Sequence, residues 1–251
     1  MSISTAPLDK RSLVRSPHSP SISPWCRSRT KRALDLAVAT LALVASAPIM
    51  VLVAMLVKVS SRGPVLFRHT RCGQDDKRIA VLKFRTMIQQ AENAGPGVTR
   101  GGDSRITGVG RMLRKCKLDE LPQLLNVIRG DMSLVGPRPD SPEYLAHLPE
   151  RLRGLIQLRP GITGWATIKY RNEEDLLSVV PAAELENYYV RTVLPRKARL
   201  DLAYAQRATL CSDLRLLIRT CRAVTLGSNE ARHRATPTNK IARTARVSST
   251  L

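Results

Sequence analysis

The chain has 251 residues, and its 41 Lys and Arg against 20 Asp and Glu give a formal net charge of +21. Charged residues make up 24% of the chain and hydrophobic residues 43%, which excludes a wholly disordered basic protein. Aromatic residues are only 4% of the chain, so it is poorly supplied for stacking nucleic-acid bases, although it can still neutralise phosphates.

Basic residues are concentrated at the two ends of the chain. Residues 1–30 and 223–251 combine them with Ser, Thr and Pro, so both segments are predicted to be basic disordered tails. The five cysteines are widely spaced and form no CxxC motif, so neither a disulfide framework nor a zinc site is indicated. A reducing, cytoplasmic environment fits this cysteine usage best.

An apolar run, residues 36–57, follows the N-terminal tail and is interrupted only by Thr40, Ser46 and Pro48. It is long enough to cross a bilayer as a helix, and too long for the apolar region of a signal peptide. Pro48 removes one helical hydrogen bond, and the hydroxyl of Ser46 can satisfy a freed carbonyl. Three structures remain open: a kinked spanning helix, a helix that turns at Ser46 and Pro48 and returns to the same face, and a buried core helix. Periodicity alone ranks them in that order.

Short elements are predicted after the apolar run. Two β-rich segments, 65–69 and 79–84, surround a polar loop with Gly73 and predict a hairpin. A glycine-rich loop follows at 92–103, and helical spacing is predicted over 106–117, 119–128, 182–189 and 200–226. Residues 136–139, a Gly-Pro-Arg-Pro sequence, are predicted to be rigid and extended because proline fixes its own φ and restricts the preceding residue.

Two adjacent acids, Asp119 and Glu120, lie just before Pro122 and just after a basic stretch at 111–117. Proline is tolerated in the first turn of a helix, so Asp119 is predicted to be a helix N-cap, in a position that favours anions. Adjacent acids on a helix point about 100° apart, which favours separate roles as nucleophile and metal ligand over a shared proton. Taken alone, a capping pair without chemistry is the simpler interpretation.

Several basic residues are candidates for binding phosphate, because Arg suits bidentate recognition and neighbouring prolines order the chain that carries it. They are Lys83 and Arg85 at the end of the hairpin, Arg138 between two prolines, and Arg159 and Arg171 on either side of residues 160–165. His69 and His147 are isolated in the sequence and receive no role.

The order of the motifs closely resembles the bacterial sugar transferases, also called monotopic phosphoglycosyl transferases. The matching segments are KRALDL at 31–36, SRGPV at 61–65, KFRTM at 83–87, DSRIT at 103–107, LDELPQ at 118–123, GDMSLVGPRP at 130–139 and RPGITG at 159–164. The resemblance covers residues 31–222. Residues 167–172 depart from the sequence that many members of the family have after Gly-Trp-Ala.

The resemblance implies an α+β, mostly helical fold. Residues 31–60 would form a re-entrant membrane helix, broken at Ser46 and Pro48, and residues 61–222 a compact cytoplasmic catalytic domain with an associated β-hairpin. It places the protein at the cytoplasmic face of the bacterial inner membrane, next to anionic lipid. The sequence leaves open whether the chain is a monomer or a homodimer.

The resemblance also implies a Mg²⁺-dependent, two-step reaction. Asp119 is similar in position to a nucleophile that takes the sugar phosphate from a nucleotide-diphosphate sugar, most simply a UDP-sugar. Glu120 is similar to the Mg²⁺ ligand. Lys83, Arg114, Arg138 and Arg171 match basic positions that hold phosphates. The acceptor would be a polyprenyl phosphate such as undecaprenyl phosphate, at the start of exopolysaccharide, capsule or O-antigen synthesis.

Two other functions remain as alternatives. One is a membrane-tethered protein that binds nucleic acid through its basic tails, which the resemblance disfavours; the other is a scaffold that keeps the fold without activity.

Overall fold

The computed structural model describes residues 21–225 except 92–94 and 96. Most of both predicted tails therefore lies outside the described residues. Residues 21–30, however, are part of the folded domain and not of a disordered tail: Ser23 Oγ donates to the carbonyl of Ala208 (2.7 Å), and Trp25 Nε1 donates to Asp213 (3.0 Å). The boundary predicted at residue 30 is wrong, because these contacts fix the segment before the apolar helix.

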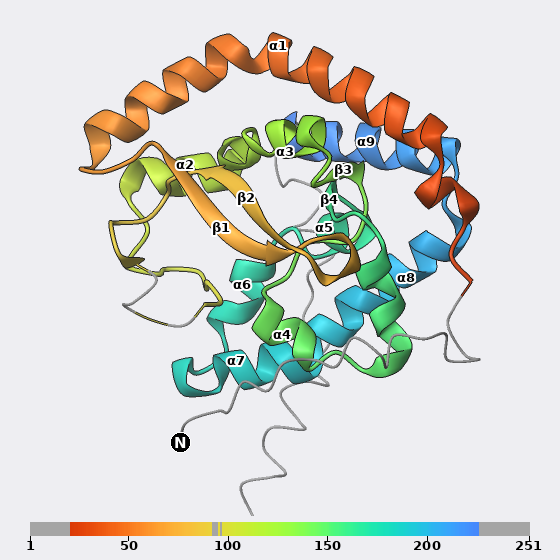
Figure 1. The fold of residues 1–251 in the computed structure, drawn as a ribbon. Helices are drawn as coiled ribbons and strands as arrows, with labels where there is room; N and C mark the ends of the chain where they lie inside the picture. Colours follow the sequence, from red (N-terminus) through yellow and green to blue (C-terminus); the bar gives the residue numbers. More distant parts are fainter. Residues whose placement is uncertain (1–20, 92–94, 96, 226–251) are drawn as a thin grey trace, which may run out of the picture.

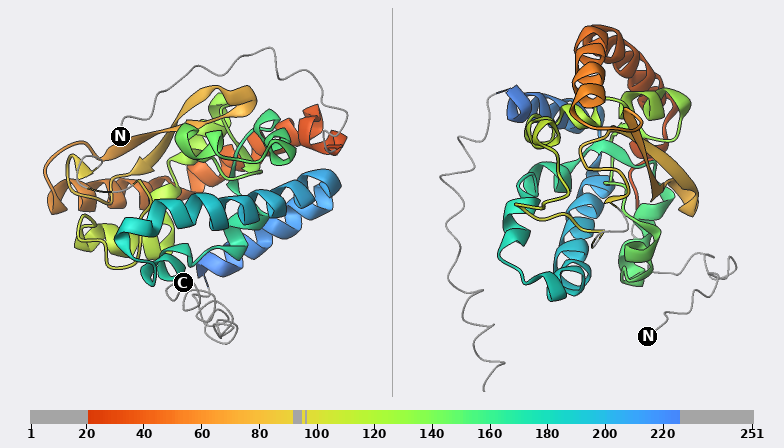
Figure 2. Two further views of the ribbon diagram at one scale, coloured as in Figure 1. Left: turned by 90° about the horizontal axis from the view of Figure 1, so that it is seen from below. Right: turned by 90° about the vertical axis from the view of Figure 1, so that its left-hand side faces the viewer.

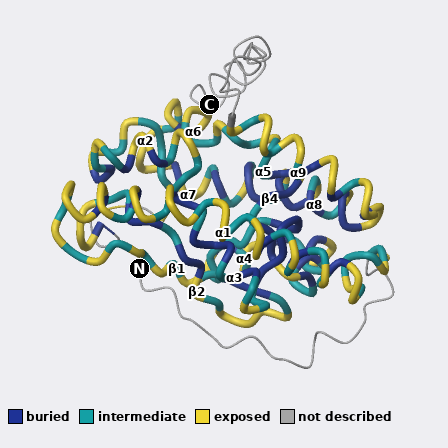
Figure 3. The backbone as a smooth tube through the Cα atoms, turned by 90° about the horizontal axis from the view of Figure 1, so that it is seen from above, coloured by how far each residue is buried: buried dark blue, intermediate teal, exposed yellow. Residues whose placement is uncertain are grey.

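Helix α1, Arg29–Ser60, contains the apolar run and remains helical through Pro48. Figure 1 shows it as an arch over the other elements, with both ends turned back toward the domain. Ala39, Val53 and Val57 on its inner face are buried, whereas its outer face carries exposed apolar residues; Figure 3 colours the helix by burial. Only 11% of its most apolar 18-residue window is buried, so the third alternative, a buried core helix, is wrong. Its length and mean hydropathy suffice to cross a membrane.

The predicted hairpin is confirmed by strands β1, Leu66–Cys72, and β2, Arg78–Phe84, which pair antiparallel with Leu66 opposite Phe84. The buried side chain of Asn126 attaches this hairpin to the helix behind it. Its Oδ1 accepts from the N–H of Leu82 (2.9 Å) and its Nδ2 donates to the carbonyl of Ala80 (2.8 Å). These bonds satisfy one N–H and one carbonyl of β2, so they fix this strand against the helix that carries Asn126.

The helical parts of the domain follow the predicted periods, with shifts in each predicted helix. The helix predicted over 119–128 begins only at Gln123, after a 3-10 turn, and the helix predicted over 182–189 is divided among a 3-10 turn, a short α-helix and a π turn. The helix predicted over 200–226 is two helices, because Ala208 is extended (φ −60°, ψ 135°) and separates them. The helix predicted over 106–117 begins later, at Gly108. The α-helices after the hairpin are α2 (Gly108–Cys116), α3 (Gln123–Arg129), α4 (Pro142–Ala146), α5 (Trp165–Lys169), α6 (Glu173–Ser178), α7 (Leu185–Tyr188), α8 (Leu194–Arg207) and α9 (Leu210–Thr225). Short 3-10 or π turns are η2 (Pro24–Arg27), η3 (Gln74–Asp76), η5 (Leu118–Glu120), η6 (Glu150–Gln157), η7 (Ala182–Glu184) and η8 (Tyr189–Val193).

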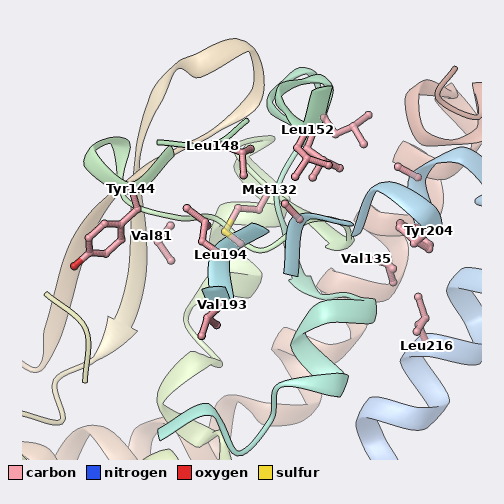
Figure 4. Packing of buried hydrophobic residues seen from close by; sticks show 14 of the residues in the cluster. Val81, Met132, Val135, Tyr144, Leu148, Leu152, Val193, Leu194, Tyr204 and Leu216 are labelled. Carbon is pink, nitrogen blue, oxygen red and sulfur yellow. The ribbon is translucent and has the colours of Figure 1, made fainter. Parts of the chain in front are cut away.

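A second small sheet lies inside the domain. Strand β3, Ser133–Val135, runs parallel to β4, Gly161–Thr163. The chains that leave the two strands pass so close that a Cβ on Gly164 would lie 2.3 Å from the carbonyl oxygen of Gly136. The main hydrophobic core surrounds this sheet, and Figure 4 shows Met132, Val135, Leu194 and Leu216 packed in it. The described fold is thus mostly helical with a β-hairpin, as predicted, and it has a second, parallel sheet that the sequence did not indicate.

Candidate functional site

The acid pair lies in turn η5, between the end of α2 and the start of α3. Lys117 ends α2 in the left-handed conformation (φ 56°), and its N–H bonds to the carbonyls of Leu113 and Arg114. The prediction that Asp119 is a helix N-cap is wrong. Pro122 occupies that position, and no side chain bonds the first N–H groups of α3. The carboxylate of Asp119 is consequently not used in capping.

Glu120 is the centre of an ion-pair network. Its Oε1 accepts from Lys83 Nζ at the end of β2 (3.0 Å) and from Arg138 NH2 in the loop after β3 (2.9 Å). Burial of Glu120 opposes its ionisation, but the charges of Arg138 and Lys83 outweigh burial and hold its pKa well below the ordinary range. Glu120 therefore stays ionised and joins two distant parts of the chain.

Asp119 differs from its neighbour in having few partners. Its residue is 6% exposed, and its Oδ1 is buried with no hydrogen-bond partner among the residues that the structure describes. Burial raises the pKa of Asp119, the positive charge of Lys83 opposes that rise, and the negative charge of Glu120 adds to it. A buried carboxylate that lacks hydrogen bonds is poorly stabilised as an anion, so it is suited to attack an electrophile.

Arg114 and Lys117 complete the basic surroundings of the acids. Both charges lower the pKa of Asp119. Arg114 pairs through NH2 with Glu174, while its NH1 is buried without a hydrogen-bond partner among the described residues. Burial lowers the pKa of Lys117. An acceptor that enters next to Asp119 would thus find at least one unused guanidinium N–H.

The remaining predicted phosphate binders have their described contacts elsewhere. Arg85 is buried under Gly63 and donates to the carbonyl and hydroxyl of Ser61, at the end of α1 (2.7 and 2.9 Å). Arg171 donates to the carbonyl of Ala223 in α9. Arg159 is exposed. After burial, its positive charge is the next cause that lowers the pKa of Arg32, at the start of α1. The structure therefore gathers Lys83, Arg114 and Arg138 around the acid pair, but not these three.

Lys117 and His69 also belong to the site. The sequence places Lys117 in the basic stretch before the acids, but not as a site residue, because the position of its side chain depends on a left-handed backbone conformation that the sequence does not indicate for lysine. His69 lies on the same face of the hairpin as Lys83, as alternation along paired strands requires. Burial, with the charges of Arg71, Lys83 and Arg138, lowers the pKa of His69 to about 3, so its imidazole is neutral. Strand alternation was the signal that could have found His69.

The donor set fits Mg²⁺ better than a metal held by the protein alone. Among the described residues no group of three or more His, Cys, Asp and Glu could hold a metal ion. Mg²⁺ is commonly bound through one or two carboxylates together with substrate phosphates and water. Asp119 has an unpartnered carboxylate oxygen and lies beside Glu120, so the pair fits that pattern.

An acid pair within a group of basic side chains, in a domain with an exposed apolar helix, is typical of membrane-associated proteins that act on phosphorylated substrates. Residues 26–227 match the bacterial sugar transferases, and the chain belongs to that family.

Similar proteins have related activities in their names. UDP-glucose:undecaprenyl-phosphate glucose-1-phosphate transferase of Caulobacter vibrioides is 39% identical over 76% of this chain and 67% of its own length. UDP-N-acetylgalactosamine-undecaprenyl-phosphate N-acetylgalactosaminephosphotransferase of Aeromonas hydrophila is 36% identical over 64% of this chain, but only 39% of its own length. Exopolysaccharide production protein ExoY of Sinorhizobium fredii is 36% identical over 78% of this chain and 86% of its own length.

Proposed function

We propose that this protein transfers a sugar-1-phosphate from a UDP-sugar to undecaprenyl phosphate, as the first step of an exopolysaccharide, capsule or O-antigen type of glycan. The names of the similar proteins support the substrate classes. The observation that carries the proposal is Asp119, whose buried and unpartnered oxygen lies among the charges of Lys83, Lys117 and Arg114.

In the proposed first step, an oxygen of Asp119 attacks the phosphorus that bears the sugar. The phosphoanhydride bond breaks, UMP leaves with its electron pair, and the sugar phosphate remains on Asp119 as an acyl phosphate. In the second step, an oxygen of the lipid phosphate attacks the same phosphorus. The bond to Asp119 breaks, and the free carboxylate is restored.

The basic residues have separate roles in this proposal. Arg114 binds a phosphate oxygen through its unused N–H, and Lys83 and Arg138 hold Glu120 beside the reacting group while their charge offsets that of the substrates. Mg²⁺, held by Glu120 and the diphosphate, would supply further neutralisation of charge on the phosphates when bound. Arg85, Arg159 and Arg171 are proposed only as supporting residues, because their described contacts lie elsewhere.

We further propose that α1 enters the inner membrane from the cytoplasmic face and returns to it. Three observations support this topology: the arch of α1, the basic residues before and after it, and its exposed apolar outer face. Helix α9 lies on the same side of the molecule (Figures 1 and 2). It exposes Leu210, Leu214 and Ile218 next to three arginines, which suits an anionic membrane surface.

The test uses the full-length protein in lipid nanodiscs with Mg²⁺, undecaprenyl phosphate and a panel that includes UDP-glucose and UDP-N-acetylgalactosamine. We expect UMP release with at least one donor, and a loss of about 10³-fold or more in Asp119→Asn, as removal of a nucleophile implies. A donor labelled in the sugar-bearing phosphate should label the wild-type protein but not Asp119→Asn. Asp175→Asn, an exposed acid on α6, is the matched control. UMP release by Asp119→Asn at the wild-type rate would contradict the covalent mechanism.

No nucleic acid is included among the proposed partners. The described basic residues of the site face an acid pair, and phosphates of a small substrate fit this arrangement better than an extended polymer. Salt-sensitive DNA binding without UMP release would favour the nucleic-acid alternative, and neither activity would favour an inactive scaffold.

A further inference from the structure

One acid reaches the site from a part of the chain that sequence motifs did not connect with it. Glu174, in the first turn of α6, pairs through Oε1 with NH2 of Arg114 at a distance of 2.9 Å. Arg114 lies in the last turn of α2, sixty residues earlier, and five residues before Asp119. The side chain of Glu174 is 41% exposed and that of Arg114 only 22%.

The guanidinium of Arg114 faces two ways. Its Nη2 lies 2.9 Å from the carboxylate of Glu174 in an ion pair, whereas its Nη1 is buried without a hydrogen-bond partner among the described residues. Its charge also lowers the pKa of Asp119. Arginine binds phosphate most strongly when two parallel N–H groups donate to two oxygens. Glu174 therefore places a negative charge against the guanidinium that a phosphate beside Asp119 would use.

We propose that Glu174 is an internal competitor of the phosphorylated donor, and that it sets the affinity of the site for a nucleoside diphosphate sugar. In the free protein its carboxylate neutralises Arg114, and the diphosphate displaces it into water. This inference rests on the proposed function for the location of the diphosphate, but it makes a separate prediction about binding.

The surroundings of Glu174 allow this exchange. The backbone of α6 is fixed, because the carbonyl of Glu174 accepts from the N–H of Gly101 (2.9 Å) and the neighbouring Glu173 pairs with Lys197 (2.9 Å). Displacement therefore needs only a rotation of one exposed side chain. Partly exposed ion pairs contribute little stability, so a divalent phosphate group can replace the carboxylate. The displaced carboxylate of Glu174 stays close to the bound diphosphate, and its negative charge continues to repel the diphosphate.

The experiment measures binding of UDP, which cannot turn over, to the full-length protein in nanodiscs with Mg²⁺ by calorimetry. Glu174→Gln keeps the shape of the side chain and removes its charge, and we expect UDP to bind three- to tenfold more tightly. The KM for the UDP-sugar should fall by a similar factor with kcat unchanged. Because the effect is electrostatic and partly exposed, it should shrink as the salt concentration is raised.

Three variants complete the design. Asp175→Asn, which removes a neighbouring charge from the same helix, should change UDP affinity less than twofold. Glu174→Ala should act in the same direction as Glu174→Gln. In an Arg114→Gln background, Glu174→Gln should have no effect, because the guanidinium for which the two anions compete is gone.

Unchanged or weaker UDP binding in both Glu174 variants would overturn the inference, as would an equal gain in Asp175→Asn. Failure of the proposed function has a different signature. If no UDP-sugar yields UMP but UDP still binds more tightly to Glu174→Gln, the competitor role stands without the reaction. If UDP binds to neither the wild type nor Glu174→Gln, the inference is wrong.

Discussion

Replacing Lys31 by Met should weaken the attachment of α1 to the rest of the protein. Lys31 Nζ pairs with Asp213 Oδ2 of α9 at 2.6 Å, and the two side chains are only 7% and 3% exposed. Asp213 also accepts from Trp25 Nε1 and from the hydroxyl of Tyr204. Lys31→Met thus leaves a buried carboxylate with two neutral donors but no countercharge.

The expected cost follows from those contacts. Removing one partner of a buried ion pair costs about 3–5 kcal/mol, and the two remaining donors favour the lower end, about 3 kcal/mol. For a domain of this size the melting temperature should fall by about 6–12 °C. The double variant Lys31→Met/Asp213→Asn should recover more than half of the loss, because the carboxylate of Asp213 is then gone. Asp35, which lies 3.9 Å from Lys31 Nζ, keeps its hydrogen bonds from β3 in both variants.

Thermal unfolding followed by circular dichroism, at one scan rate in nanodiscs, measures these differences. Glu150→Gln is the control, because it breaks an ion pair with Arg153 in which the carboxylate is exposed, and it should change stability by less than about 1 kcal/mol. A melting temperature of Lys31→Met equal to that of Glu150→Gln would refute the reasoning. So would a double variant that is less stable than Lys31→Met.

Two further predictions concern pH and topology. Burial raises the pKa of Asp201 from 3.8 to about 7, so the folded protein keeps a proton that the unfolded chain releases, and stability falls as pH rises between these values. The free energy of unfolding should fall by about 4 kcal/mol over this pH range because of Asp201. Asp201→Asn should make the free energy of unfolding, measured by denaturant titration at several pH values, less dependent on pH. An unchanged dependence on pH would contradict the burial argument. With the native cysteines replaced by Ser, Arg29→Cys and Arg62→Cys should both react with an impermeant thiol reagent only from the cytoplasmic side. Labelling from opposite sides would establish a spanning helix.

The predictable parts of the fold depend on neighbours in sequence. Alternation around Gly73 indicated the hairpin, and the apolar composition of residues 36–57 indicated the exposed helix α1. The break at Ala208 was not predictable, because the residues on both sides have helical spacing and Ala is a strong helix former. The hydroxyl of Ser23 donates to the carbonyl of Ala208 at this break, and sequence periodicity carries no information about a contact between residues so far apart in the chain.

In the candidate site, too, the sequence indicates the residues but not their long-range contacts. From the residues alone Asp119 and Glu120 were more simply a capping pair, and the resemblance of the motifs to a family indicated their roles; Lys83 and Arg138 lay beside recognisable turn and proline signals. Which basic residue meets which acid depends on long-range packing, and so the pairings of Lys83 and Arg138 with Glu120 became visible only in three dimensions. The same holds for Arg114 with Glu174, and for the separation of Arg85 and Arg171 from the acid pair.

The N-terminal half of α1 is bonded directly to the strand that leads to the site. The buried carboxylate of Asp35 accepts from the hydroxyl of Ser133 (2.7 Å) and from the N–H of Leu134 (3.2 Å), both in β3. Arg138 follows only a few residues later and holds Glu120. A short series of contacts therefore connects the apolar helix to the acid pair through β3 and Arg138. The depth at which α1 lies in lipid would consequently set the distance of Asp119 from the membrane surface. A fragment without α1 would lose this connection to the membrane, and it would also lose Asp35, the carboxylate that accepts hydrogen bonds from Ser133 and Leu134 in β3.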